Sequence, residues 1–199
     1  MAAPSGESSA LRREIGLWQG TALNVIDMVG VGPFVGSASA AAGGGGCQLH
    51  GTASISPGLS TTAQNFSYSF TGNLTNCQSS TAGPASGTVF AGTNGLPVPT
   101  GNGSCGSSTT SGIAVAQWAD GTTTVVQYTT CGALAAVALQ GTVIASVTSS
   151  TGTTYTTTRY AGDGALGTLA FQPPDPSACA TTGVTTAGID GFVGIGSSS

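Results

Sequence analysis

Residues 65–74 read NFSYSFTGNL and decide the fold of this 199-residue chain. Every second residue from Phe66 to Phe70 is aromatic, and the residues between them are serines. Gly72 and Leu74 continue the aromatic face, with a bend or bulge at the glycine. A period of two places alternate side chains on opposite faces of a strand. The stretch therefore predicts a β-strand with one face buried.

The same period recurs on both sides of this stretch. Valine and leucine share one parity across residues 137–147, and Asp120-Gly121 lies between two strand-like runs as a hairpin signal. Residues 131–140 are rich enough in alanine to form a short helix. Weaker strand candidates are residues 52–56, 85–91, 153–160, 166–171 and 184–195. About nine strands at this spacing predict an all-β fold, either an antiparallel β-sandwich or a closed β-barrel.

Charge is nearly absent from the chain. Only 5% of the residues are charged, whereas a typical soluble domain has roughly 25%. From Cys47 onward the charged residues are four aspartates and one arginine, so this part carries a net charge of −3. Nucleic-acid binding relies on lysine and arginine to neutralise phosphate, so the composition argues against a nucleic-acid partner.

A change of composition divides the chain into three parts. They are an N-terminal hydrophobic targeting or anchor segment (residues 1–42), a glycine linker (43–46) and an all-β domain (47–199). Residues 15–35 are mostly apolar and follow Arg12 and Arg13, so they predict a helix that spans a bilayer with a cytoplasmic N-terminus. The Ala-x-Ala site at residues 38–40 indicates, as an alternative, a cleaved signal peptide. In both cases the domain is exported to the extracellular space or the cell envelope, and an uncleaved segment would anchor it in the membrane.

Residues 11–35, LRREIGLWQGTALNVIDMVGVGPFV, resemble the first transmembrane helix of permeases of the amino acid–polyamine–organocation superfamily. The resemblance lies in the LRREIGL lead and in GVGPF at residues 30–34, where the helix of that family is broken. Such a break frees backbone groups for the charged ends of a substrate. No second hydrophobic span follows in the sequence. The resemblance therefore implies, as an alternative function, a fragment or fusion of an amino-acid permease that retains only this helix.

All five cysteines lie in the third part, and their spacing shows no CxxC motif and no zinc-site pattern. Disulfides in an oxidising compartment account for them better. Five cysteines can form two bridges in several ways, and the sequence leaves the connectivity open. The preferred pairs are Cys47–Cys77 and Cys105–Cys179, which leave Cys131 free.

Residues 47–199 resemble uncharacterised secreted β-rich proteins of soil bacteria, through residues 47–77 and 174–185. That family supplies no activity, so the resemblance implies only an exported β-domain. Because titratable side chains are scarce, we expect a disulfide-stabilised domain with a structural or binding role at the bacterial cell envelope and no enzymatic activity.

Few side chains of this domain could take part in catalysis or bind a metal ion. His50 could act as a general base, but a histidine at a strand edge more often has no such role. Asp120, Asp163 and Asp190 each precede glycine and could offer oxygen atoms to Ca²⁺, yet Asp-Gly is also the usual sequence of tight turns. We therefore expect no catalytic residue, no metal site and no cofactor.

Aromatic side chains are the remaining candidates for recognition, because they can stack on sugars or pack against a protein. The residues that could form such a binding face are Trp118, Tyr128, Tyr155 and Tyr160. The partner expected for this face is a protein or a glycan at the cell surface. Phe66, Tyr68 and Phe70 are expected in the core.

Overall fold

The computed structural model describes residues 44–79 and 82–196. The helix expected at residues 15–35 lies outside these residues, and so do the anchor, signal-peptide and permease interpretations that depend on it. Within the described ranges, no helix combines the length and the apolar character needed to cross a membrane. Gly45 and Gly46 belong to the first strand. The first strand thus begins two residues before Cys47, the first residue of the all-β part expected from the composition.

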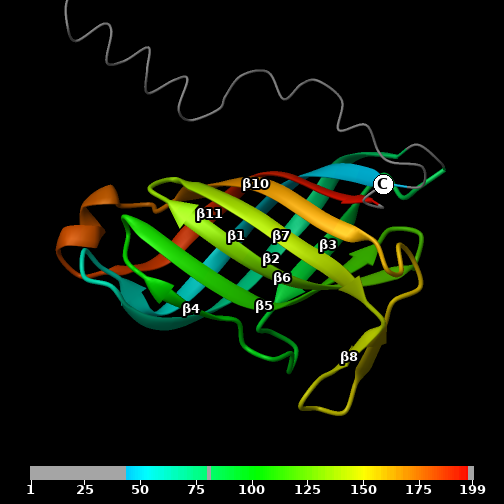
Figure 1. Ribbon diagram of the computed structural model, residues 1–199, viewed down its shortest axis with the longest axis horizontal. Coiled ribbons are helices and arrows are strands. Elements are labelled where there is room, and N and C mark those ends of the chain that lie inside the picture. Colours follow the sequence, from blue (N-terminus) through cyan, green and yellow to red (C-terminus); the bar gives the residue numbers. More distant parts are fainter. Residues whose placement is uncertain (1–43, 80–81, 197–199) are drawn as a thin grey trace, which may run out of the picture. The chain divides into compact units, whose positions relative to one another are not determined.

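The described chain forms eleven strands and one short 3₁₀ helix (Figure 1). The strands are β1 (Gly45–Leu59), β2 (Gln64–Ser79), β3 (Gly87–Ala91), β4 (Thr100–Gly103), β5 (Ser107–Trp118), β6 (Thr123–Ala133), β7 (Ala136–Ile144), β8 (Ser146–Thr148), β9 (Thr154–Thr156), β10 (Gly164–Gln172) and β11 (Val184–Gly196). The 3₁₀ helix η1 covers Pro176–Ala180.

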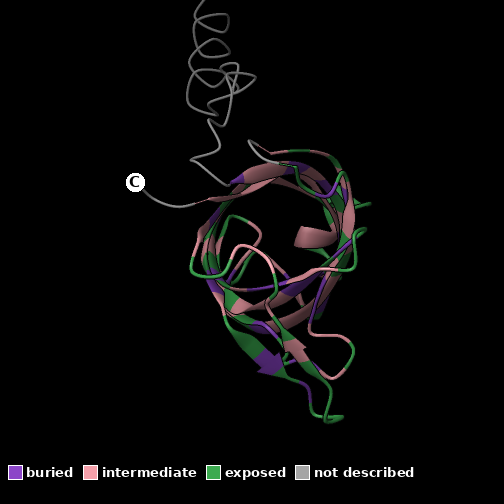
Figure 2. Cartoon of the chain, turned by 90° about the vertical axis from the view of Figure 1, so that its right-hand side faces the viewer, coloured by how far each residue is buried: buried purple, intermediate pink, exposed green. Residues whose placement is uncertain are grey.

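Eight strands close into an antiparallel barrel, which decides between the two architectures that the sequence leaves open. The order around the ring is β1, β2, β3, β5, β6, β7, β10 and β11, and β11 pairs with β1 to close it. The extra strand β4 pairs with β2 and β5 beyond the end of β3, so β3 and β4 share one place in the ring. Figure 2 looks along the barrel and shows the ring of strands. Neighbouring strands follow each other along the chain, as in an up-and-down barrel.

Alternation places the large apolar side chains inside the barrel. Leu49 of β1 and Phe66 and Leu74 of β2 are buried, whereas Thr52 and Thr71, at the alternate positions of the same strands, are exposed. The half-buried strand predicted at residues 65–74 is therefore confirmed as part of β2. The Asp120-Gly121 hairpin is also confirmed, because β5 and β6 pair on either side of it.

Gly51 of β1 makes room for an inward aromatic ring. A Cβ atom at Gly51 would lie 2.5 Å from Cζ of Phe70 and 2.6 Å from the carbonyl oxygen of Thr71. We expect Gly51→Ala to lower the free energy of unfolding by about 1–3 kcal/mol, the usual cost of overpacking a core. Gly46→Ala is the matched control in the same strand, because its nearest contact, the Val193 carbonyl oxygen, would be at an ordinary 3.6 Å. Urea unfolding measures both variants, and equal stabilities would contradict the prediction.

A second apolar cluster lies outside the barrel wall. Val115 of β5 and Val125 of β6 are fully buried, although the adjacent Ala114, Ala116 and Val126 line the lumen. They pack with Phe90, Leu96 and Val147. Val147 belongs to the β8–β9 hairpin, which projects from the side of the barrel in Figure 1. Strands covered on both faces are apolar at consecutive positions, so simple alternation does not predict this outer cluster.

Residues 131–140 form a hairpin, so the short helix suggested by their alanine content is wrong. β6 ends at Ala133 and β7 begins at Ala136, and these two residues pair across the turn. Leu134 in the turn has a φ of 53°, in the left-handed region. β6 and β7 also pair with β5 and β10 on their other edges. Sheet pairing on both sides thus outweighs the helix propensity of alanine, which is the highest of any residue but is worth less than about 1 kcal/mol per residue.

Candidate functional site: the barrel lumen

The lumen of the barrel contains a cavity of about 200 Å³. All eight strands of the ring contribute to its lining, which is mostly apolar and includes no charged side chain of residues 44–79 or 82–196. An engineered apolar cavity of about 150 Å³ binds benzene, and pockets for drug-sized ligands span roughly 300–1,000 Å³. The lumen therefore has the size and the surface to hold one small apolar molecule.

One end of the lumen is closed by η1. Ala178 and Cys179 of η1 pack against the buried cluster that contains Leu59 and Phe66. Cys179 forms a disulfide with Cys105, which precedes β5. The 3₁₀ helix η1 is therefore held at this end of the lumen by a covalent bond as well as by packing.

The opposite end is closed by aromatic side chains. Trp118, the last residue of β5, meets Tyr160 edge to face with ring centroids 6.0 Å apart, and both line the cavity. Trp118 Nε1 donates to Thr124 Oγ1 at 2.8 Å. The Thr124 hydroxyl, fully buried, donates in turn to the carbonyl oxygen of Arg159 at 3.1 Å. Side-chain packing and hydrogen bonds thus tie residues 159 and 160 to this end of the barrel.

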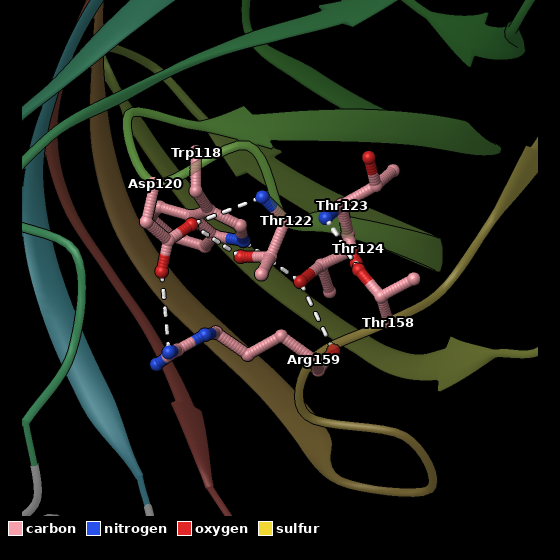
Figure 3. A network of polar contacts seen from close by, with 7 residues as sticks. All are labelled: Trp118, Asp120, Thr122, Thr123, Thr124, Thr158 and Arg159. Carbon is pink, nitrogen blue, oxygen red and sulfur yellow. Dashed lines mark hydrogen bonds and ion pairs between the residues drawn. The ribbon is translucent and has the colours of Figure 1, made fainter.

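Figure 3 shows the polar network around this closure. Arg159 Nη2 lies 3.2 Å from Asp120 Oδ2, and the guanidinium lies 5.5 Å from the centroid of the Tyr160 ring. Asp120 also accepts hydrogen bonds from the hydroxyl and the backbone N–H of Thr122. These two bonds, with a smaller contribution from Arg159, hold the pKa of Asp120 below its usual value. The network fixes the β5–β6 turn against the segment that carries Tyr160.

Four hydroxyl groups form a hydrogen-bonded row inside the mostly apolar lumen. The Tyr68 hydroxyl lies 2.7 Å from that of Tyr128 and 3.1 Å from that of Thr110. The Thr110 hydroxyl lies 2.7 Å from that of Thr130. All four residues line the cavity. Burial is the largest cause that raises the pKa of both tyrosines, so both hydroxyls stay protonated at neutral pH.

The sequence does not single out this hydroxyl row. Tyr68 is expected in the core with its aromatic neighbours, and the threonines are unremarkable in a threonine-rich chain. The available signal is the alternation of side chains along the strands. Tyr68 lies two residues after Phe66 and therefore on the same face of its strand, and Thr130 likewise follows Tyr128. Polar residues on an inward-facing side of a strand are candidates for a polar site within a core.

The predicted aromatic binding face is not a single surface. Trp118, Tyr128 and Tyr160 line the lumen. Tyr155 lies outside the barrel wall, where its ring meets that of Phe90 with centroids 5.6 Å apart. The structure therefore brings three of the four predicted residues together, but around the internal cavity and not on an exposed face.

His50 and Asp190 pair on the outside of the barrel. His50 Nδ1 lies 2.6 Å from Asp190 Oδ1, and the His50 side chain is 58% exposed. Neither residue lines the lumen. Asp190 lies within β11, and Asp120 and Asp163 lie in turns, so the three Asp-Gly pairs do not converge. Among the described residues, no group of three or more histidine, cysteine or acidic side chains is arranged to hold a metal ion.

The outer wall carries an open groove over β1, β2, β4, β5, β6 and β7. Hydroxyl and amide side chains line it, and Asn102 Nδ2 donates to Asn65 Oδ1 at 2.8 Å. Its one aromatic lining residue, Phe66, is buried. A sugar ring would have no aromatic face to stack on here, so the lumen is the better candidate site.

The structure contains the disulfides Cys47–Cys77 and Cys105–Cys179, the two pairs preferred from the sequence. Cys47–Cys77 links the neighbouring strands β1 and β2, with Cα atoms 4.1 Å apart. Cys131 of β6 is free and exposed. Two disulfides in a β-barrel are consistent with an exported, disulfide-stabilised domain.

Comparison with protein-family models, with curated proteins and with solved structures finds no match to this chain. The geometry of the lumen is therefore the basis for inferring a function.

Proposed function

We propose that this protein is an exported, non-enzymatic binding protein that holds one small, mostly apolar molecule inside its β-barrel. The observation that carries the proposal is the cavity of about 200 Å³, lined by all eight strands of the ring and by none of the charged residues that the structure describes. A concave, largely apolar site with a few convergent polar groups is the usual form of a small-molecule site. The hydroxyls of Tyr68 and Tyr128 supply such groups.

Binding accounts for the lumen better than catalysis does. General acid–base catalysis needs a titratable group poised near neutral pH. Burial raises the pKa of Tyr68 and Tyr128, so these two lining side chains stay protonated there. His50 and Asp190 lie on the outer face, out of reach of a molecule in the lumen.

Export is supported by the two disulfides, which persist in oxidising compartments outside the cytoplasm. The bacterial cell envelope is the proposed place of action. It rests on the resemblance of residues 47–77 and 174–185 to secreted proteins of soil bacteria. In that setting the barrel would protect or carry a molecule that dissolves poorly in water.

Thermal unfolding of the oxidised full chain with toluene tests the proposal. At ten times the dissociation constant, mass action stabilises the folded state by about 1.4 kcal/mol. This corresponds to a rise of about 3–6 °C in melting temperature for a domain of this size. Toluene matches the volume of the cavity, whereas palmitate, which is long and charged, should give no rise.

A variant whose lumen is filled by a larger side chain is the control for the toluene experiment. Ala114 of β5 lines the cavity, so Ala114→Phe should abolish the toluene effect. Ala138→Phe makes the same change on the exposed face of β7 and should leave it intact. The milder Ala114→Leu serves if the phenylalanine variant does not fold. An absent toluene shift, or an unchanged shift in the filled variant, would refute binding in the lumen.

A further inference from the structure

The hydroxyl row in the lumen brings together residues from strands that are not neighbours. Tyr68 lies on β2 and Tyr128 on β6, and these strands are separated in the ring by the place that β3 and β4 share and by β5. The two tyrosine hydroxyls nevertheless meet at 2.7 Å. They can do so only inside the lumen, at the tips of long side chains. The shorter Thr110 and Thr130 keep their hydroxyls close to the wall.

A count of protons shows that the four hydroxyls together keep one hydrogen-bond donor unused. Each hydroxyl has one proton to donate, so the four groups have four protons. They are joined by three contacts, Tyr128–Tyr68, Tyr68–Thr110 and Thr110–Thr130, and each contact uses one proton. Whichever way the bonds point, one O–H remains. It belongs to Tyr128 when every hydroxyl donates toward that residue, and to Tyr68 when Tyr128 and Thr110 both donate to it, so an acceptor beside the tyrosines favours these two arrangements. No other described side chain or backbone group hydrogen-bonds with these four hydroxyls, so the remaining proton has no partner within the described protein.

A buried donor without a partner costs free energy, which a ligand with an acceptor atom would recover. The ligand should be neutral, because none of the described residues that line the cavity is charged and an unpaired charge is costly to bury. Burial raises the pKa of Tyr128, so its hydroxyl remains a donor and not a phenolate. A carbonyl oxygen on a small apolar body meets both requirements.

We propose that the lumen selects a small neutral carbonyl compound, of the size of an aromatic ketone, whose oxygen accepts the remaining proton from the Tyr68–Tyr128 pair. This inference rests on the proposed binding of a small molecule in the lumen and adds its chemical class. The ring of the ligand occupies the apolar part of the cavity, and the carbonyl points toward the two tyrosines.

Three ligands of nearly equal size test the inference on the full chain by isothermal titration. Acetophenone has the carbonyl, isopropylbenzene has a methyl group in place of its oxygen, and benzoate carries a charge. The decisive variant is Tyr68→Phe combined with Tyr128→Phe, because either tyrosine can supply the proton. The ratio of acetophenone affinity to isopropylbenzene affinity should fall about tenfold in this variant, which equals about 1.4 kcal/mol. Benzoate should not bind measurably to either protein.

Tyr155→Phe removes a tyrosine hydroxyl outside the barrel and should leave the affinity ratio unchanged. If the double variant does not fold, Tyr128→Phe alone is measured, with a smaller fall expected. An unchanged affinity ratio in a folded tyrosine variant would overturn the inference and leave the hydroxyl row as an internal brace. Failure of both neutral ligands to bind the wild-type protein would instead overturn the proposed function itself.

Discussion

Replacing Cys105 and Cys179 together by alanine is expected to lower the free energy of unfolding by about 4 kcal/mol. The bridge joins residues 74 positions apart. In the chain-entropy model, closing a loop of this length lowers the entropy of the unfolded state and so raises its free energy by about 4.5 kcal/mol. The same bridge also fixes η1 over one end of the lumen, so its loss should reduce ligand affinity as well. Urea unfolding and the toluene-induced melting shift measure the two effects.

The other cysteines provide matched comparisons for this prediction. Cys47 and Cys77 are 30 positions apart, and the shorter loop predicts a smaller loss of about 3.7 kcal/mol for their double alanine variant. Cys131 is free and exposed, so Cys131→Ala should change stability by less than about 0.5 kcal/mol. A Cys105/Cys179 variant as stable as Cys131→Ala would show that the long-range bridge does not stabilise the fold.

Trp118→Ala is expected to lower the free energy of unfolding by about 3–5 kcal/mol, the range for removing a buried large aromatic side chain. The indole is only 8% exposed and packs against Tyr160 at the end of the lumen. Its removal leaves a cavity next to an existing one and takes the donor from the buried Thr124 hydroxyl. Urea unfolding monitored by far-ultraviolet circular dichroism measures the loss.

Trp118→Phe separates the two contributions. It retains most of the ring packing against Tyr160 and loses only the N–H bond to Thr124, so the expected loss is smaller, about 1–3 kcal/mol. If Trp118→Ala were no more destabilising than Trp118→Phe, packing of the indole would not be what closes this end of the barrel.

Local pattern explains which parts of the fold could be predicted. The period of two at residues 65–74 and the Asp120-Gly121 turn depend on contacts within a few residues, and both recur in the structure as expected. The hairpin at residues 131–140 and the outer cluster around Val125 do not follow from local pattern. In each case a partner distant in sequence, β10 for β7 and the β8–β9 hairpin for Val125, determines the outcome.

The candidate site was predictable only in its residue types. Aromatic side chains were the expected recognition elements, and Trp118, Tyr128 and Tyr160 line the lumen. Their location inside the barrel could not be predicted from the sequence. The alternation of side chains along a strand shows that its two faces differ, but it does not show that one of them will enclose a lumen. Tyr68 joins them because strand order brings β2 and β6 to the same interior.

The sequence by itself determined the all-β character, the hairpin at Asp120-Gly121 and the near absence of charged groups from the domain. Only the tertiary structure decided that the sheet closes into a barrel, that the barrel contains a cavity and that four hydroxyls meet in it. The physical reason is the distance along the chain over which these contacts form. Closure depends on β1 pairing with β11, where Gly45 lies opposite Ile195. A two-residue period carries no information about a partner 150 residues away.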